Sequence, residues 1–147
     1  MATIQKFEDL EIWQKSRSLC SLIFEFIRKE PFSREYKLVN QIISASGSTL
    51  DNIAEGFERG GRNEFIQFLS IAKGSAGEVK SQLYRASDRN YISNTELEAG
   101  YNLADSICKG CNGMMSYLNS STYKGEKFKG RVEETSQDYG NLTDQFS

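Results

Sequence analysis

The sequence predicts an all-α fold, an antiparallel up-down-up-down four-helix bundle that is followed by a polar C-terminal tail. Four segments place apolar side chains at the three- and four-residue spacing of one helix face. The 147 residues include a single proline, Pro31, and proline is the residue that most often interrupts helices. The connections between the segments are short, so consecutive helices should be antiparallel neighbours.

The first two predicted helices run from about Glu8 to Lys29 and from about Ser33, a plausible N-cap, to the glycines around Gly60. Each has a series of residues at alternating three- and four-residue spacing, which we assign to the core. In the first helix these residues are Leu10, Trp13, Arg17, Cys20, Phe24 and Ile27. In the second helix they are Tyr36, Val39, Ile43, Ser46, Leu50, Ile53 and Phe57.

The third and fourth predicted helices have regular heptad spacing. The third spans about Arg62 to Arg89, and its core series is Phe65, Leu69, Ala72, Ala76, Val79, Leu83 and Ala86. The fourth opens at Ser93, which forms a capping-box pattern with Glu96. Its core series is Leu97, Tyr101, Ala104, Cys108, Cys111, Met115 and Leu118.

Periodicity ends after the fourth helix, which predicts a bundle over residues 1–119 and a tail over residues 120–147. The tail is polar, and we expect it to be flexible, although its Tyr123, Phe128, Tyr139, Leu142 and Phe146 would also allow it to dock on a partner. The N-terminal segment lacks a signal-peptide pattern, and no stretch approaches 18 apolar residues. We therefore expect a cytoplasmic protein that does not span a membrane.

A series of residues in the predicted second and third helices resembles a known family. The matching stretches are Asn52-Ile53-Ala54-Glu55-Gly56-Phe57, Asn63-Glu64-Phe65, Phe68-Leu69, Ile71-Ala72-Lys73-Gly74-Ser75, Glu78 and Gln82-Leu83, with Phe7-Glu8-Asp9-Leu10-Glu11-Ile12-Trp13-Gln14 at the start. Over about residues 5–119 the chain is similar to the four-helix bundle proteins encoded within intervening sequences of 23S ribosomal RNA genes. The accessory variability determinant protein of diversity-generating retroelements is a relative.

The resemblance implies an antiparallel bundle that assembles into a ring, typically a homopentamer. For the retroelement relatives it also implies a basic surface that binds nucleic acid, with a reverse transcriptase as partner. The chain departs from the family pattern at Ile43-Ser44, where relatives often have two arginines, and at Leu50, where relatives often have proline.

The composition excludes several kinds of chemistry. The chain has no histidine, which removes Ser-His-Asp and Cys-His catalysis and the histidine-containing metal sites. Cys108 and Cys111 form a C-x-x-C pair, but both belong to a core series, and we interpret them as small core residues. We predict no catalytic residues, no metal and no cofactor. A carboxylate-based nuclease would need several acidic residues in one pocket, and the core series contain none.

Six basic residues are candidate contacts for RNA or DNA: Arg59, Arg62, Lys73, Lys80, Arg85 and Arg89. Lys73 and Lys80 share a helix face, and Arg59 and Arg62 flank a glycine-rich turn. The formal net charge of −2 argues against a strongly basic binder, but an oligomer would repeat each patch several times. The alternative is that these residues are ordinary charged side chains on solvent-exposed helix faces and bind no ligand.

The first helix has more apolar surface than one bundle core can bury. Apolar residues outside its assigned core series predict an oligomer interface, and the candidates are Ile12, Leu19, Leu22 and Phe26. The alternative is that the tail covers this second face.

Polar residues flank the core of the second and third helices. One stripe comprises Ser75, Glu78, Gln82 and Arg85, and another comprises Ser48, Asn52 and Glu55. Because Arg17 belongs to the inward series of the first helix, we expect it to pair with Glu78 or Glu55. A structural role for the stripes is one interpretation, and a binding cleft is the other.

These observations predict a non-enzymatic, oligomeric four-helix bundle that binds nucleic acid or a nucleoprotein partner. The alternative function is a protein–protein scaffold that does not bind nucleic acid directly.

Overall fold

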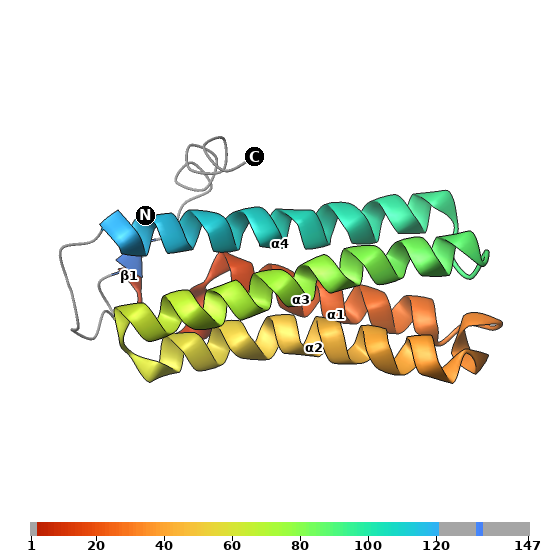
Figure 1. Ribbon diagram of the computed structural model, residues 1–147, viewed down its shortest axis with the longest axis horizontal. Coiled ribbons are helices and arrows are strands. Elements are labelled where there is room, and N and C mark those ends of the chain that lie inside the picture. Colours follow the sequence, from red (N-terminus) through yellow and green to blue (C-terminus); the bar gives the residue numbers. More distant parts are fainter. Residues whose placement is uncertain (1–2, 121–131, 134–147) are drawn as a thin grey trace.

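Four long helices form most of the computed structural model, which describes residues 3–120 and 132–133 (Figure 1). They are α1 (Glu11–Ile27), α2 (Tyr36–Arg59), α3 (Arg62–Asp88) and α4 (Asn94–Ser120). Each helix packs mainly against two neighbours, so that the cyclic order is α1–α2–α3–α4. Consecutive helices run in opposite directions, which confirms the predicted antiparallel four-helix bundle. Among the described residues, none of the helices is both long and apolar enough to cross a membrane.

The helix ends follow local capping chemistry. Ser93 caps α4 as predicted: its Oγ accepts from the Glu96 amide at 3.1 Å, and its amide donates to Glu96 Oε1 at 2.9 Å. Gly60 ends α2 with a left-handed φ of 81°, a conformation that glycine adopts without strain. The predicted N-cap at Ser33 was wrong, because Ser33 lies within a short 3-10 helix, η2 (Phe32–Arg34), and α2 begins at Tyr36.

A short two-stranded pairing joins the two ends of the described chain. The β1 strand (Thr3–Ile4) pairs antiparallel with β2 (Val132–Glu133), and Thr3 faces Glu133. A 3-10 helix, η1 (Phe7–Asp9), then leads into α1. The bundle ends at Ser120, one residue beyond the predicted boundary. Of the predicted flexible tail the structure describes only Ser120 and β2, and the other tail residues lie outside the described part of the chain.

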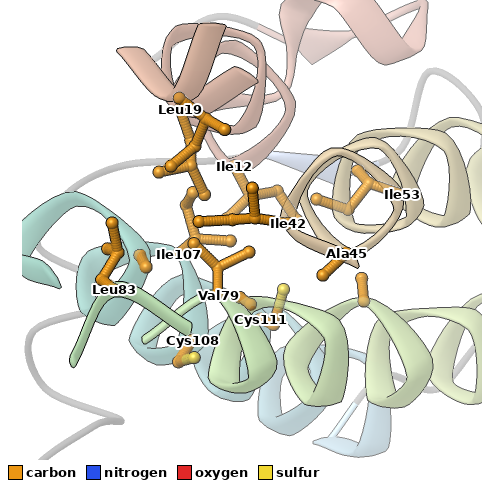
Figure 2. Close-up of a cluster of buried hydrophobic side chains, with 14 of the residues drawn as sticks. Ile12, Leu19, Ile42, Ala45, Ile53, Val79, Leu83, Ile107, Cys108 and Cys111 are labelled. Carbon is orange, nitrogen blue, oxygen red and sulfur yellow. The ribbon is translucent and has the colours of Figure 1, made fainter. Parts of the chain in front are cut away.

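The core runs along the whole bundle and receives side chains from all four helices (Figure 2). The heptad series of α3 was predicted correctly. All seven members have no exposed surface: Phe65, Leu69, Ala72, Ala76, Val79, Leu83 and Ala86. Three of them are alanines, which let α2 and α4 approach α3 closely.

The predicted inward faces of α1 and of the first half of α2 were wrong by one residue. In α1 the buried series is Ile12, Ser16, Leu19, Ile23 and Phe26, and in α2 it includes Leu38, Ile42, Ala45 and Thr49. Several members of the two predicted series are nevertheless buried as predicted: Leu10, Ile27, Ser46, Ile53 and Phe57. Both helices have two apolar faces about 100° apart, and helical spacing alone does not decide which of them faces the core.

The shift also displaces Arg17, and the predicted ion pair of Arg17 with Glu78 or Glu55 was wrong. The Arg17 side chain is exposed and lies over the ring of Trp13, 5.8 Å from its centroid. It forms no ion pair with any described residue. Glu55 instead pairs with Arg59 at 3.0 Å.

The predicted core role of Cys108 and Cys111 is confirmed, because their exposed fractions are 9% and 0%. Burial raises the pKa of the Cys108 thiol, which disfavours the reactive thiolate. Buried hydroxyls are satisfied locally: Ser46 donates to the carbonyl of Ile42 at 2.8 Å, and Thr49 donates to that of Ala45 at 2.9 Å.

Replacement of Gly56 by alanine should destabilise the bundle by about 1–3 kcal/mol. A Cβ at this position would lie 2.6 Å from Phe68 Cβ and 3.1 Å from Phe65 Cδ1, where α2 crosses α3. The matched control is Gly77→Ala in α3, where no atom lies within 4 Å of the added Cβ, and helix propensity should stabilise it by about 0.5–1 kcal/mol. Urea unfolding of both variants measures the difference, and equal effects at the two positions would contradict the close contact.

Candidate nucleic-acid interface

One face of the bundle, between α3 and α4, combines lysines with tyrosines. We call this surface the α3–α4 strip, and its members are Lys73, Lys80, Tyr84, Tyr101, Asp105 and Lys109. The α3 members lie seven and four residues apart, and the α4 members lie four apart, so each set follows one side of its helix. The two helices are neighbours, and contacts of Lys80 with Asp105 and of Tyr84 with Tyr101 bring the two sets together.

Asp105 links the lysines at the centre of the strip. Its Oδ1 lies 3.0 Å from Lys80 Nζ, and its Oδ2 lies 3.4 Å from Lys109 Nζ. The ammonium group of Lys80 also lies 4.9 Å from the centroid of the Tyr101 ring, at cation–π distance. Tyr84 meets Tyr101 edge-to-face at 5.6 Å and is 52% exposed, so one aromatic ring of the pair faces solvent.

The ion pair of Lys80 and Asp105 shifts the pKa of both groups in the direction that favours their charged forms. The hydrogen bond from Lys80 lowers the pKa of Asp105. For Lys80 itself, burial acts to lower the pKa, but Asp105, Cys108 and Tyr101 together outweigh burial and raise it. Three lysines and one aspartate therefore leave the strip with a formal charge of +2, while the whole chain has −2.

The other predicted contact residues lie elsewhere on the bundle. Arg59 pairs with Glu55 near the α2–α3 turn, and Arg62 there donates to the carbonyl of Leu118 at 3.2 Å. Arg85 lies on the opposite flank of α3, where it donates to Gln41 Oε1 at 3.1 Å, and Arg89 caps the far end of α3. The 27 residues of α3 extend for about 40 Å, so the six residues do not form one patch within a protomer.

Only Lys73 and Lys80 of the predicted six share the strip. Sequence reasoning missed Lys109, Tyr84 and Tyr101, because their place on the strip depends on how α3 and α4 are aligned. The spacing of Tyr101, Asp105 and Lys109 along one helix face was the available signal.

The predicted interface residues are mostly core residues of the protomer. Ile12, Leu19 and Phe26 are 1%, 0% and 5% exposed, which removes them from the surface, and Leu22 is half-buried. This correction follows from the shifted inward face of α1.

A different apolar surface lies between α1 and α2. We call it the α1–α2 strip, and its members are Trp13, Cys20, Phe24, Tyr36, Val39, Ile43 and Leu50. Phe24, Ile43 and Tyr36 are 59%, 48% and 73% exposed. Cys20 Sγ donates to the carbonyl of Ser46 at 3.3 Å, which holds the two helices side by side here. The predicted excess of apolar surface on the first helix therefore exists, but on the other face.

The predicted polar stripes of the second and third helices meet each other. Ser48 and Ser75 share a hydrogen bond of 3.0 Å, and Asn52 donates to Ser48 Oγ at 2.9 Å. Farther along, a polar cleft of about 520 Å³ opens between the same helices. Its lining residues are Asn40, Gln41, Ser44, Glu78, Ser81, Gln82 and Arg85. Within the described part of the chain, no group of three or more Cys, Asp or Glu residues is arranged to hold a metal ion.

The fold and its surfaces define a class: an all-α, four-helix bundle with a lysine- and tyrosine-bearing face and a separate apolar face. The model of the family described as 23S rRNA-intervening sequence protein matches residues 8–113, which is most of the bundle. The chain therefore belongs to the 23S rRNA-intervening sequence protein family, as its sequence motifs suggested. A comparison with curated proteins finds no match.

Asp105→Asn should lower the stability of the bundle at neutral pH by about 0.5–1 kcal/mol, because it removes the partner of two lysines. The folded-state pKa of Asp105 is below its ordinary value of 3.8, so the wild-type advantage is present above that value. It disappears as the pH falls through the lower folded-state pKa. Urea unfolding at pH 7 and at successively lower pH measures this, and an undiminished difference in acid would contradict the ion pair.

Proposed function

We propose that this chain is a non-enzymatic, self-associating bundle that binds structured RNA or DNA through the α3–α4 strip. The observation that supports the proposal is the alignment of three lysines and two tyrosines on one face. Lysines neutralise phosphates, and an exposed tyrosine offers a stacking surface for an unpaired base. Membership of the family supports the fold and leaves the ligand to be tested.

The proposal requires several copies of the strip. A charge of +2 on one protomer gives only weak, salt-sensitive attraction to a phosphate backbone. In an oligomer the strip is repeated, and linked weak contacts give a much higher overall affinity. Self-association is therefore part of the proposed mechanism.

We infer that the α1–α2 strip is the surface of self-association, in place of the predicted Ile12, Leu19, Leu22 and Phe26. Its Phe24, Tyr36 and Ile43 side chains expose about half or more of their surface, and such clusters commonly mark protein interfaces. A homopentameric ring, which the family resemblance implies, is the assembly we propose. Because the α1–α2 and α3–α4 edges are opposite each other in the cyclic order, this contact leaves the basic face open.

The second candidate function is a protein–protein scaffold that does not bind nucleic acid directly, and the exposed apolar surface of the α1–α2 strip favours it. In this case the α1–α2 strip would contact a different protein. For both functions we propose a cytoplasmic location, where buried and half-buried thiols such as Cys20 and Cys108 stay reduced.

Charge reversal on the α3–α4 strip should weaken nucleic-acid binding. The double variant Lys73→Glu, Lys109→Glu should bind labelled structured RNA and duplex DNA at least about tenfold more weakly at low salt. The slope of log affinity against log salt should also fall by about one for each lysine that contacts a phosphate. Fluorescence anisotropy at several salt concentrations measures both quantities.

The matched control is Lys37→Glu, which reverses an exposed lysine on α2, away from the strip. It should change the affinity by less than about twofold, since it preserves the strip and alters the net charge in the same direction. Equal losses in the control and in the single Lys109→Glu variant would show that only net charge matters. Absence of binding by the wild type at low salt would exclude nucleic acid as a direct ligand and favour the scaffold.

Introduction of a charge into the α1–α2 strip should dissociate the oligomer. Phe24→Glu or Ile43→Glu places a carboxylate on an exposed apolar side chain, and burial of an unpaired charge is strongly unfavourable. Sedimentation velocity should show a monomer for either variant. Ile71→Glu is the control, because Ile71 is similarly exposed (46%) but lies on α3. A wild type that remains monomeric, or variants that remain assembled, would overturn this interface.

A further inference from the structure

The polar cleft between α2 and α3 contains a buried acceptor without a partner. Gln82 is only 7% exposed, and its Nε2 donates to the main-chain carbonyl of Gln41 at 3.4 Å. Its Oε1 accepts no hydrogen bond in the described structure. A buried acceptor without a donor costs roughly 1–3 kcal/mol of stability. An N–H or O–H group that donated to Gln82 Oε1 would therefore be bound favourably.

A free carboxylate lies one helical turn from this oxygen. Glu78 precedes Gln82 by four residues on α3, which brings their side chains to about 5–6 Å at Cβ. Glu78 is exposed, lines the same cleft and forms no ion pair with any described residue. The cleft thus places a charged acceptor and a neutral acceptor next to each other.

Arg85, the cation that lines the cleft, forms no hydrogen bond with Glu78 or with Gln82 Oε1 in the described structure. Arg85 extends across to α2, where its Nη1 donates to Gln41 Oε1 at 3.1 Å. The hydroxyl-bearing residues Ser44 and Ser81 also line the cleft. The ligand that suits this arrangement is therefore a cation with several N–H donors on one rigid group.

We propose that this cleft binds the guanidinium group of an arginine side chain on a partner polypeptide. A guanidinium has five N–H donors in a planar fork, so it would bridge the carboxylate of Glu78 and the amide oxygen of Gln82 at once. Lysine would supply a point charge without this fork. Gln82 Oε1 has almost no exposed surface, so the donor reaches it only when side chains that line the cleft move aside.

The inference is independent of nucleic-acid binding, because the cleft and the α3–α4 strip lie on opposite flanks of α3. The probe is the peptide acetyl-Gly-Arg-Gly-amide, titrated at millimolar concentration into isotope-labelled wild-type protein. NMR should show saturable shifts of the side-chain amide of Gln82. The peptide with citrulline in place of arginine, which is nearly isosteric but uncharged, should bind at least roughly tenfold more weakly.

Variants of the cleft separate binding from folding. Glu78→Gln should lower the affinity for the arginine peptide by roughly tenfold or more. Glu98→Gln, which removes an exposed carboxylate on α4, should leave this affinity unchanged. Arg85→Gln should bind as tightly as the wild type or more tightly, since it removes a like charge from the cleft. Gln82→Leu, followed through the backbone amides of the residues that line the cleft, should abolish their saturable shifts without lowering the melting temperature.

Three results would overturn the proposal. They are the absence of saturable binding, equal binding of the citrulline peptide, and equal weakening by Glu78→Gln and Glu98→Gln. A large loss of stability in Gln82→Leu would make Gln82 a structural residue, and the exposed Glu78 would then still report on binding. Saturable binding of spermidine without binding of the peptide would reject a polypeptide as the source of the cation.

Discussion

The close packing of α3 against both α2 and α4 is the constraint on which the other features of this bundle depend. The inward face of α3 has no exposed surface over seven positions, and three of these are alanines. Small side chains let the neighbouring helices approach, and Gly56 of α2 lies directly against Phe65 and Phe68. As a result α3 has fixed neighbours on both flanks, and polar side chains on those flanks meet partners at defined positions. Both the α3–α4 strip and the polar cleft follow from this placement.

How much of the fold was predictable differs from helix to helix, for a physical reason. The heptad series of α3 and the capping box at Ser93 were predicted correctly, because each has one self-consistent local pattern. In α1 and α2, two apolar faces compete, and one of them contains Trp13, Phe24 and Ile43. Large apolar residues normally indicate the core, yet here smaller residues such as Ser16, Ala45 and Thr49 face inward. Packing against the other helices decides between the faces, and that information is not local in sequence.

The candidate sites show the same division between local and long-range information. The shared face of Lys73 and Lys80 was visible from their spacing, and so was the polar stripe that contains Gln82. The pairing of Lys80 with Asp105 was not, because these residues come from different helices and meet only in one alignment of α3 with α4. The separation of Arg85 and Lys80 onto opposite flanks of α3 also became clear only from their partners, Gln41 and Asp105.

The cyclic order of the helices places the α1–α2 strip and the α3–α4 strip far from each other on the bundle. The apolar α1–α2 strip and the basic α3–α4 strip lie on opposite edges of the bundle, so a contact at one edge does not cover the other. If each protomer joins its neighbours through the apolar edge and surfaces beside it, the basic edges are displayed together around the assembly. The overall charge of −2 is then compatible with binding to phosphates, because Asp105 is the only acidic residue of the described chain that belongs to the basic strip. Local charge near a contact acts within a Debye length of about 10 Å, so the composition of the strip matters more than the charge of the whole chain.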